Sequence, residues 1–378
     1  MPDLISRLVM LLLLLISSQS YAQSTVQLIE TSSSIRLSGQ LKILFEEDQQ
    51  LTVQQVNQQI DRFVWQSGDN PNYGFTDKGA WLYTTISNVT DVDDWVIDVA
   101  FSQLEKVDIY ILLEDKIISQ TQQGKARFGQ HYRLPTLKTE LPYAQTVSLF
   151  IRIESAHSSL VAPVDIQTHH YHEKMNFYDN LLWGLFYGGL LILAIYNFVL
   201  FLGIREKSLI AYVSYIAAVI IWQFVWSGHS HLVMPEGFSR WENEHTDLIF
   251  IIIGVFSGLF TCVFSDIQRT APKSYRVVAS SIILLSILGL CSVVSLFPPI
   301  WQSSLVYLVS LIAISSYTCA GFESYNNQFY AARYFIFAWS ILAAAAIIGM
   351  LSLVGVFPSN FFTTYCFQFG VFLEAGLF

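Results

Sequence analysis

The chain of 378 residues has few cysteines and few charges, and both shortages narrow the classes of protein to which it can belong. Charged residues make up 13% of the chain, against about 25% in soluble globular domains. The four cysteines all fall in apolar runs of the C-terminal half (Cys262, Cys291, Cys319 and Cys366). The N-terminal half therefore has no cysteine with which to form a disulfide, and packing alone must stabilise its core.

Basic clusters and enzyme motifs are also missing. Residues 23–178 contain 19 acidic and 12 basic residues without a basic stripe, which argues against nucleic acid as a partner. No G-x-S-x-G, H-E-x-x-H or P-loop sequence occurs, and acidic pairs such as Glu46-Glu47 are typical of solvated loops. We therefore predict no catalytic residue and no cofactor for residues 1–378.

Long apolar runs are abundant in the C-terminal half. Seven of them follow residue 179, and each is about twenty residues long, which is enough to cross the hydrocarbon core of a bilayer as a helix. They cover 180–203, 209–227, 247–265, 277–297, 301–322, 334–356 and 360–378. We predict an all-α domain of seven transmembrane helices at residues 179–378.

The cations between these runs predict the orientation. The second, fourth and sixth connections carry only Arg240, whereas the first, third and fifth carry Arg205, Lys207, Arg269, Lys273, Arg276 and Arg333. Positively charged loops stay in the cytoplasm, so the first run should begin outside and the seventh should end inside. We expect a multi-pass protein of the bacterial inner membrane with its N-terminal domain in the periplasm.

An export signal agrees with this orientation. Arg7 precedes the nine apolar residues Leu8–Ile16, and Ser20-Tyr21-Ala22 follows them. A positive start, a short apolar segment and a small-residue site are typical of a signal peptide, and the apolar segment is too short to span a membrane. We predict a signal peptide at residues 1–22 that is cleaved after Ala22.

Residues 23–168 are predicted to form an all-β periplasmic domain. A helix is expected near Thr52–Arg62, where Thr52 and Gln55 have capping-box spacing. Partial alternation of β-branched or aromatic with polar residues predicts strands at 80–88, 95–101, 107–113, 116–120 and 147–154. Such strands favour a two-sheet antiparallel sandwich, with a jelly roll as the leading topology. Residues 169–178 would form a short juxtamembrane linker.

Several segments occur in an order that is found in a known family. In the first half these are "LTVQQV", "GAWLYTTISN", "LEKVDIYI", "HYRLP" and "VSLFIRIES", and in the second half "YGGLLILAIYNFVLFLGIREKSLIAYVSYI" and "WSGHSHL". Together they resemble the bacterial seven-transmembrane receptors with diverse intracellular signalling modules that carry the type 2 extracellular domain. The chain departs from that pattern at Tyr83, where the family pattern has an Arg after the Trp-Leu pair.

The resemblance implies a transmembrane signalling receptor. Its sensor domain would bind a small extracytoplasmic ligand, and a carbohydrate is the class implied. The signal would reach a cytoplasmic histidine kinase or diguanylate cyclase. The chain stops at Phe378 without such a module, so we expect that the module is missing, the alternative being a receptor that signals through a separate partner. Because both output types act as dimers, a homodimer is also expected.

Two other function classes compete with a receptor. A transporter would carry midplane charges or Gly/Pro-interrupted helices in paired positions, and the seven runs show almost no interior ionisable residue and no internal repeat. A membrane-anchored binding protein would need fewer than seven spans. The receptor interpretation is therefore preferred over both.

Candidate ligand contacts are aromatic and cationic residues of the exported domain. Sugar rings stack on exposed aromatic faces, and arginines supply hydrogen bonds to hydroxyl groups. We predict a ligand-facing cluster of Trp81, Tyr83, Arg127 and Arg133. The alternative for Trp81, which lies in a predicted strand, is a position in the core.

Candidate relay residues lie in the membrane runs. The resemblance singles out the pair Tyr196-Asn197 before the first cytoplasmic loop. Glu374 is a carboxylate inside an apolar run, where it either reaches an interface or makes a polar contact that links the seventh helix to its neighbours. The histidines of "HHYH" at 169–172 and those near 230 fit a wet linker and loop as well as a metal site, so no metal is predicted.

Overall fold

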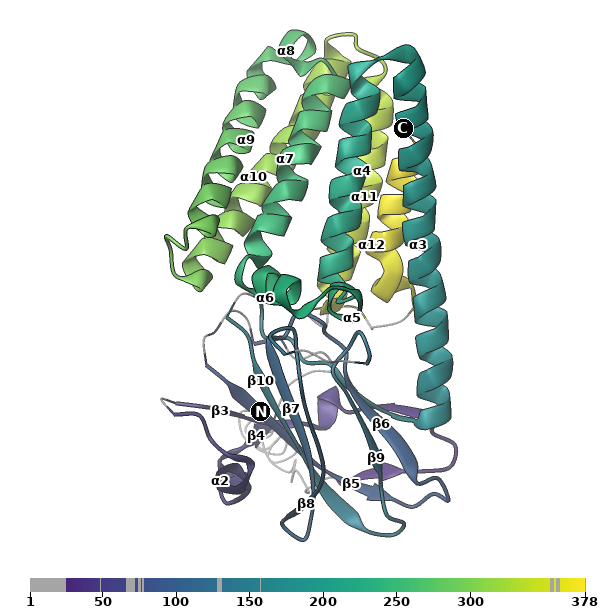
Figure 1. Cartoon of the computed structure of the whole chain (residues 1–378), viewed down its shortest axis with the longest axis vertical. Helices are drawn as coiled ribbons and strands as arrows, with labels where there is room; N and C mark the ends of the chain where they lie inside the picture. The colour runs from purple at the N-terminus through teal and green to yellow at the C-terminus, as the bar shows by residue number, and fades with distance from the viewer. Residues whose placement is uncertain are drawn as a thin grey trace, which may run out of the picture.

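A β-rich unit lies beneath a bundle of helices, and one long helix connects the two (Figure 1). The computed structural model describes residues 25–47, 49–65, 72–73, 76, 78–127, 131–156, 158–353, 357 and 361–377. The predicted signal peptide at 1–22 lies outside the described residues.

The β-rich unit is a sandwich of two sheets. The larger one, sheet A, has the neighbour order β4 (Val64–Trp65), β3 (Lys42–Phe45), β5 (Ala80–Asn88), β10 (Thr146–Glu154), β7 (Lys106–Leu113) and β8 (Lys116–Gln123). These strands pair antiparallel. A further strand, β1 (Val26–Leu28), pairs in parallel with the end of β5 that β3 leaves open. All-antiparallel pairing was therefore wrong for this one strand.

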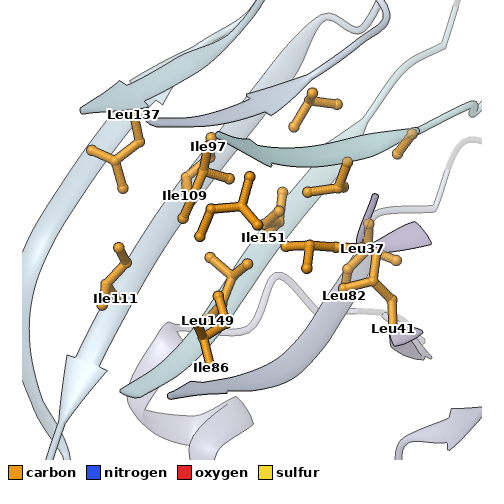
Figure 2. Packing of buried hydrophobic residues seen from close by; sticks show 14 of the residues in the cluster. Leu37, Leu41, Leu82, Ile86, Ile97, Ile109, Ile111, Leu137, Leu149 and Ile151 are labelled. Atoms are coloured by element: carbon orange, nitrogen blue, oxygen red, sulfur yellow. The ribbon is translucent and has the colours of Figure 1, made fainter. Parts of the chain in front are cut away.

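Sheet B is smaller, with the order β2 (Ser34–Arg36), β11 (Val164–Thr168), β6 (Asp94–Val99) and β9 (Thr136–Glu140). Alternate residues of both sheets point into the space between them, where aliphatic side chains such as Leu82, Ile97 and Ile151 pack (Figure 2). This layer is the core of the domain. The five predicted strands are all present, whereas the jelly-roll topology stays a prediction.

A short helix covers part of the other face of sheet A. α2 (Val53–Asn57) begins at Thr52, whose side chain accepts from the Gln55 amide while the Gln55 side chain accepts from the Thr52 amide, so the predicted capping box is present. α2 and the two short 3-10 helices, η1 (Ser38–Gln40) and η2 (Ile60–Arg62), are the helical turns of this unit. Val53 and Val56 of α2 pack in a second apolar cluster over sheet A.

The upper part of the molecule is a helical bundle. All seven predicted runs are helical: α3 (His169–Ile204), α4 (Lys207–Trp226), α7 (Thr246–Phe264), α9 (Pro272–Val293), α10 (Pro299–Asn326), α11 (Ala332–Leu353) and α12 (Phe361–Gly376). In the described part of the chain, the first six are long and apolar enough to cross a membrane, and α12 is shorter, with 16 residues. The short helices α5 (Ser230–Val233), α6 (Glu236–Glu244) and α8 (Ile267–Thr270) lie in connections.

Apolar side chains cover much of the outer surface of the bundle. Ile192, Leu290 and Leu311 are each more than half exposed. Such a surface is stable when the acyl chains of a bilayer cover it, since backbone groups are already satisfied within the helices. The bundle is therefore the membrane domain.

The connection between the units is helical rather than a separate linker. Residues 169–178, which we expected to form a juxtamembrane linker, are the first turns of α3, whose N-cap is Thr168 at the end of β11. With 36 residues, α3 is about 54 Å long, so it extends well beyond a hydrocarbon core of about 30 Å. The excess length runs alongside the sandwich (Figure 1).

Candidate functional site

We call the outward face of sheet A the Arg152 face. It carries two of the four predicted ligand residues, Trp81 and Tyr83, and also Asp108, the ion-pair partner of a third, Arg127. Strand register places Trp81 of β5 and Asp108 of β7 on either side of Arg152 of β10. The next row of the same face places Tyr83 and Tyr110 on either side of Phe150.

A buried ion network holds one end of this face, and Glu46, which we expected in a solvated loop, is part of it at 5% exposure. Arg152 donates from Nε to Glu46 Oε1 at 2.9 Å and from Nη2 to Glu46 Oε2 at 2.7 Å. Nη2 also donates to Glu154 Oε2 at 2.7 Å, and Trp81 Nε1 donates to Glu46 Oε1 at 2.8 Å. Burial alone would raise the pKa of Glu46, but the hydrogen bonds from Arg152 and Trp81 hold it below its ordinary value.

Trp81 and Tyr83 are covered in this state. They are 1% and 4% exposed, so no sugar ring can stack on either of them without movement of the residues above. Tyr110 is partly exposed and stacks on Trp81, with ring centroids 6.0 Å apart. The core alternative for Trp81 matches its burial, and a contact between Trp81 and a ligand remains a prediction.

The accessible part of the Arg152 face is polar. Arg127 forms an ion pair with Asp108, and the exposed Gln122 of β8 lies opposite Asp108 in register. Arg127, Gln122 and Tyr110 thus form an open rim next to the covered aromatic residues. A guanidinium, an amide and an aromatic ring are groups that can bind a small polar molecule.

Arg133, the fourth predicted ligand residue, lies elsewhere. Its Nη2 donates to Asp179 Oδ2 of α3 at 2.7 Å, and its Nη1 donates to the Ser227 carbonyl at the end of α4 at 3.0 Å. The guanidinium also lies over the ring of Trp183 on α3. On the membrane side, Tyr365 of α12 donates to Asp179 Oδ1. We call this set of contacts the Arg133 junction.

Two more sensor side chains bind the same end of α4. Ser102 donates to the Trp226 carbonyl at 2.9 Å, and Gln103 Nε2 donates to the carbonyls of Val225 and Trp226 at 3.1 and 2.7 Å. The last carbonyls of a helix have no partner within it, so sensor residues satisfy them here. The sensor domain therefore acts as the C-terminal cap of α4.

The close approach at this point depends on Gly228. Its φ of +87° is a left-handed conformation, and a Cβ atom there would lie 2.8 Å from Ser102 Cβ and 2.9 Å from the Arg133 carbonyl oxygen. The next residue, His229, is held against Ser227 Oγ at 2.6 Å. Burial, and secondly the charge of Arg133, lowers the pKa of His229 to about 4, so it is neutral at pH 7.

The first turns of α3 are bound to sheet B. His172 Nδ1 lies 3.0 Å from Asp98 Oδ2 of β6. Glu173 accepts from Tyr132 at 2.6 Å and from Lys138 of β9 at 3.1 Å, and these hydrogen bonds hold its pKa below the ordinary value. A movement of the sandwich must therefore move the base of α3.

The predicted relay residues occupy three different environments. Tyr196 is exposed on the outward side of α3, whereas Asn197 is buried and donates to the Leu193 carbonyl of its own helix. Glu374 is fully buried and accepts from Tyr215 of α4 at 3.0 Å. Glu374 thus makes a contact between α12 and α4, which was one of the two alternatives for it, and the relay role of all three residues stays a prediction.

Sequence reasoning missed two important groups. Arg152 interrupts the alternation of an otherwise apolar strand, and such a cation at a buried strand position is a signal for a buried ion pair. Asp179 stands alone at the outer end of the first apolar run, where a carboxylate indicates a polar partner outside the bundle. Among the residues described, no group of three or more His, Cys, Asp or Glu side chains could hold a metal ion.

Comparison with known proteins assigns both units to one architecture. The family model described as 7TM diverse intracellular signalling matches residues 179–378, which is more than half of the chain. The model described as 7TMR-DISM extracellular 2 matches residues 38–168. No curated protein matches the chain significantly.

Proposed function

The chain belongs to the seven-transmembrane receptors with diverse intracellular signalling, and from this premise we propose that it passes the binding of a small extracytoplasmic ligand to its membrane helices through the Arg133 junction. It is a membrane-embedded sensory receptor with an extracellular domain at its N-terminus and an intracellular signalling partner. The identity of the ligand, the route of the signal and the output module are proposed here in addition to family membership.

The ligand site in this proposal is the Arg152 face. Tyr110, Arg127 and Gln122 offer an aromatic surface and hydrogen-bonding groups at its rim, and Arg152 Nη1 has no hydrogen-bond partner among the described residues. A ligand that displaced the cover over Trp81 would gain a stacking surface and this donor. A carbohydrate fits such a site, since its rings and hydroxyl groups use both features.

The contacts of the Arg133 junction are the main support for the proposed relay. One sensor side chain contacts α3 and the end of α4 directly, and it reaches α12 through Asp179 and Tyr365. Three membrane helices thus share one contact with the sensor domain. A ligand that favours one orientation of the sandwich then favours one arrangement of these helices, by as much as its affinity for the two states differs.

The output completes the proposal. The seventh helix would deliver the signal to a diguanylate cyclase or histidine kinase on the cytoplasmic side of a bacterial inner membrane, and two copies of the receptor would bring two output modules together. The positive-inside distribution of Lys and Arg supports this orientation. Glu374, bound to Tyr215, is the proposed last step of the relay within this chain.

A two-step experiment tests the proposal. A panel of mono- and disaccharides, with amino acids as the non-carbohydrate arm, is first screened for thermal stabilisation of the full chain in lipid discs. For a sugar that stabilises it, backbone hydrogen exchange of residues 225–229 is measured with and without the sugar. We expect wild type to respond, Arg133→Gln to bind without responding, and Arg127→Ala to bind more weakly.

Two results would count against the proposal. Stabilisation by amino acids alone would rule out a carbohydrate as the ligand. An unchanged exchange response in Arg133→Gln would rule out the Arg133 junction as the route of the signal. Arg36→Gln, which affects a partly exposed ion pair with Asp165 on sheet B of the sensor domain, is the matched control and should leave both binding and response as in wild type.

A further inference from the structure

Three buried ionisable side chains meet where the sensor domain rests on the second outer loop, and the relay described above does not use them. Lys125, in the turn after β8, is 1% exposed, and Glu242 on α6 is fully buried. His231 on α5 lies with Nε2 3.5 Å from Glu242 Oε1. The lysine thus comes from the sensor domain, whereas the histidine and the glutamate come from the outer loop of the membrane domain.

Lys125 crosses the boundary between the two units. Its Nζ donates to Thr246 Oγ1 at the start of α7 at 2.5 Å and to Gln103 Oε1 at 3.4 Å. Thr246 Oγ1 in turn contacts the Glu242 carbonyl at 3.0 Å. The ammonium group is therefore part of the docking contact, beside the segment that carries Glu242.

Other charged and titratable groups around this cluster already have hydrogen bonds. Glu105, on the sensor side, accepts from the Ala156 amide at 3.0 Å. Asp247 of α7 accepts from Ser303 of α10 at 3.0 Å and lies near Tyr307 of the same helix. Burial lowers the pKa of Lys125, and the charges of Glu242 and of these two carboxylates oppose that shift.

His231 and Glu242 differ from these groups. In the part of the chain that the structure describes, both ring nitrogens of His231 and both carboxylate oxygens of Glu242 make no hydrogen bond of normal geometry, although Ser230 lies close enough to Glu242 to lower its pKa. Buried polar atoms without partners are rare and costly. A proton placed between the two side chains would give each of them a charged partner.

We propose that Lys125, His231 and Glu242 form a proton-binding site through which acidity outside the membrane weakens the docking of the sensor domain. Glu242 can pair with one of two cations. With His231 neutral, the charge of Lys125 is the one that favours ionised Glu242. With His231 protonated, the imidazolium pairs with Glu242 and repels Lys125, so the arrangement with Lys125 withdrawn becomes favoured.

The direction of the pH dependence follows from linkage. Burial, and secondly the charge of Lys125, lowers the pKa of His231 to about 4, whereas a solvated histidine titrates near 6.5. The undocked state therefore takes up a proton first as the pH falls. Docking is at full strength above about pH 6.5 and weakens as the pH falls toward 4.

Glu242 acts in the opposite direction. Burial raises its pKa, against the opposing effects of a hydrogen bond from Ser230 and of the Lys125 charge, so a docked Glu242 takes up a proton more readily than a solvated one. In the proposed site, the effect of His231 on docking is larger than the opposite effect of Glu242. Its consequence for signalling rests on the proposed relay, but docking can be measured without any ligand or output.

The test uses the full chain in lipid discs at pH 7.5, 6.0 and 5.0. Hydrogen exchange of residues 225–233 is measured and each rate is divided by the chemical exchange rate at that pH. In wild type we expect protection to fall on the order of tenfold between pH 7.5 and 5.0. His231→Gln, which cannot become cationic, should show no such fall.

Two further variants complete the test. His245→Gln changes a histidine of the same loop that contacts the Trp241 carbonyl instead of the cluster, and it should keep the wild-type fall. Lys125→Met removes the competing cation but not the burial of His231, so it should make the fall smaller than in wild type. This variant tests the proposal if His231→Gln does not fold. A wild-type fall in either His231→Gln or Lys125→Met, or constant protection in wild type, would overturn the proposal. Arg133→Gln should keep the fall, so a failed relay and a failed proton site are told apart.

Discussion

The Arg152 face and the Arg133 junction are both built around an arginine, but their surroundings differ. The Arg152 side chain is 4% exposed and binds two carboxylates of its own sandwich. The Arg133 side chain is 17% exposed, and it binds a carboxylate and a backbone carbonyl of the membrane domain. The first arginine is fixed by strand register, whereas the second lies at the boundary between the two units and retains some exposure to water.

This difference indicates that Arg152 stabilises the fold, whereas Arg133 is suited to transmitting a movement. A buried ion pair that loses one partner leaves an uncompensated charge, so it tolerates little change. A contact between two units that keeps some access to water leaves less uncompensated charge when it breaks, and such contacts are suited to a junction with two arrangements. The predictions below test this contrast, beginning with the largest expected effect.

Arg152→Ala should destabilise the sandwich by about 3–5 kcal/mol, because it leaves Glu46 buried without its ion-pair partner. Urea unfolding of the full chain, followed by tryptophan fluorescence, measures the loss. Arg62→Ala is the matched control, since its pair with Glu47 is mostly exposed and its removal should change stability by less than about 1 kcal/mol. Equal effects of the two substitutions would show that the network is not structurally important.

Arg133→Gln should leave the sandwich as stable as in wild type but loosen its docking by about 1–3 kcal/mol, because Asp179 and the Ser227 carbonyl lose a charged donor. Hydrogen exchange of residues 225–229 would then accelerate, while that of β7 and β10 would not. Arg127→Gln, whose ion-pair partner Asp108 lies within the sandwich, should show the opposite distribution. Faster exchange throughout the sandwich of Arg133→Gln would erase the contrast between the two arginines.

Acid should affect the Arg152 face in a defined direction. Despite burial, the pKa of Glu46 is held below its ordinary value by hydrogen bonds from Arg152 and Trp81, and that of Glu154 by hydrogen bonds from Lys106 and Arg152. Their contribution to stability is therefore present above the ordinary value and is lost as the pH falls through the lowered one. The urea concentration at the midpoint of unfolding should therefore decrease when the pH is lowered below 4.5. The decrease should be smaller in a Glu46→Gln, Arg152→Met double variant. An equal drop in both proteins would contradict this assignment.

Thr52→Ala should have the smallest effect, about 1 kcal/mol, because it removes one cap from α2. Thr52→Ser keeps the hydroxyl group and should restore most of the loss. Urea unfolding measures both variants. If the Ser variant were as unstable as the Ala variant, the cap would not explain the position of this helix over the Arg152 face.

Long, regular patterns were predicted well from the sequence. The seven apolar runs and the five strands with alternating residues were found because burial imposes a period on many consecutive positions. The short strands β1, β2, β4 and β11 have two to five residues, too few to show a period. Partners far apart in sequence set the pairing of these strands.

The candidate site was predicted only in part, for a related reason. Trp81, Tyr83 and Arg127 were chosen by residue type. Strand register brings Trp81 and Tyr83 to one face, and an ion pair with Asp108 brings Arg127 to its edge. Arg133 was chosen by the same rule, but its partner Asp179 lies 46 residues further on, across the boundary between the two units. No local pattern connects such residues, because the contact exists only once both units have folded.

The most direct test of the relay inserts Gly-Ser-Gly-Ser between Thr168 and His169, where β11 passes straight into α3. With the sugar that stabilises wild type, the change in hydrogen exchange at residues 225–229 and 361–368 is measured in lipid discs. We predict that the insertion keeps sugar binding and abolishes the exchange response at both segments, because the Arg133 junction can transmit a movement of the sandwich only while β11 holds the sandwich rigidly to α3. An insertion variant that responds as wild type does would contradict a relay through this rigid connection.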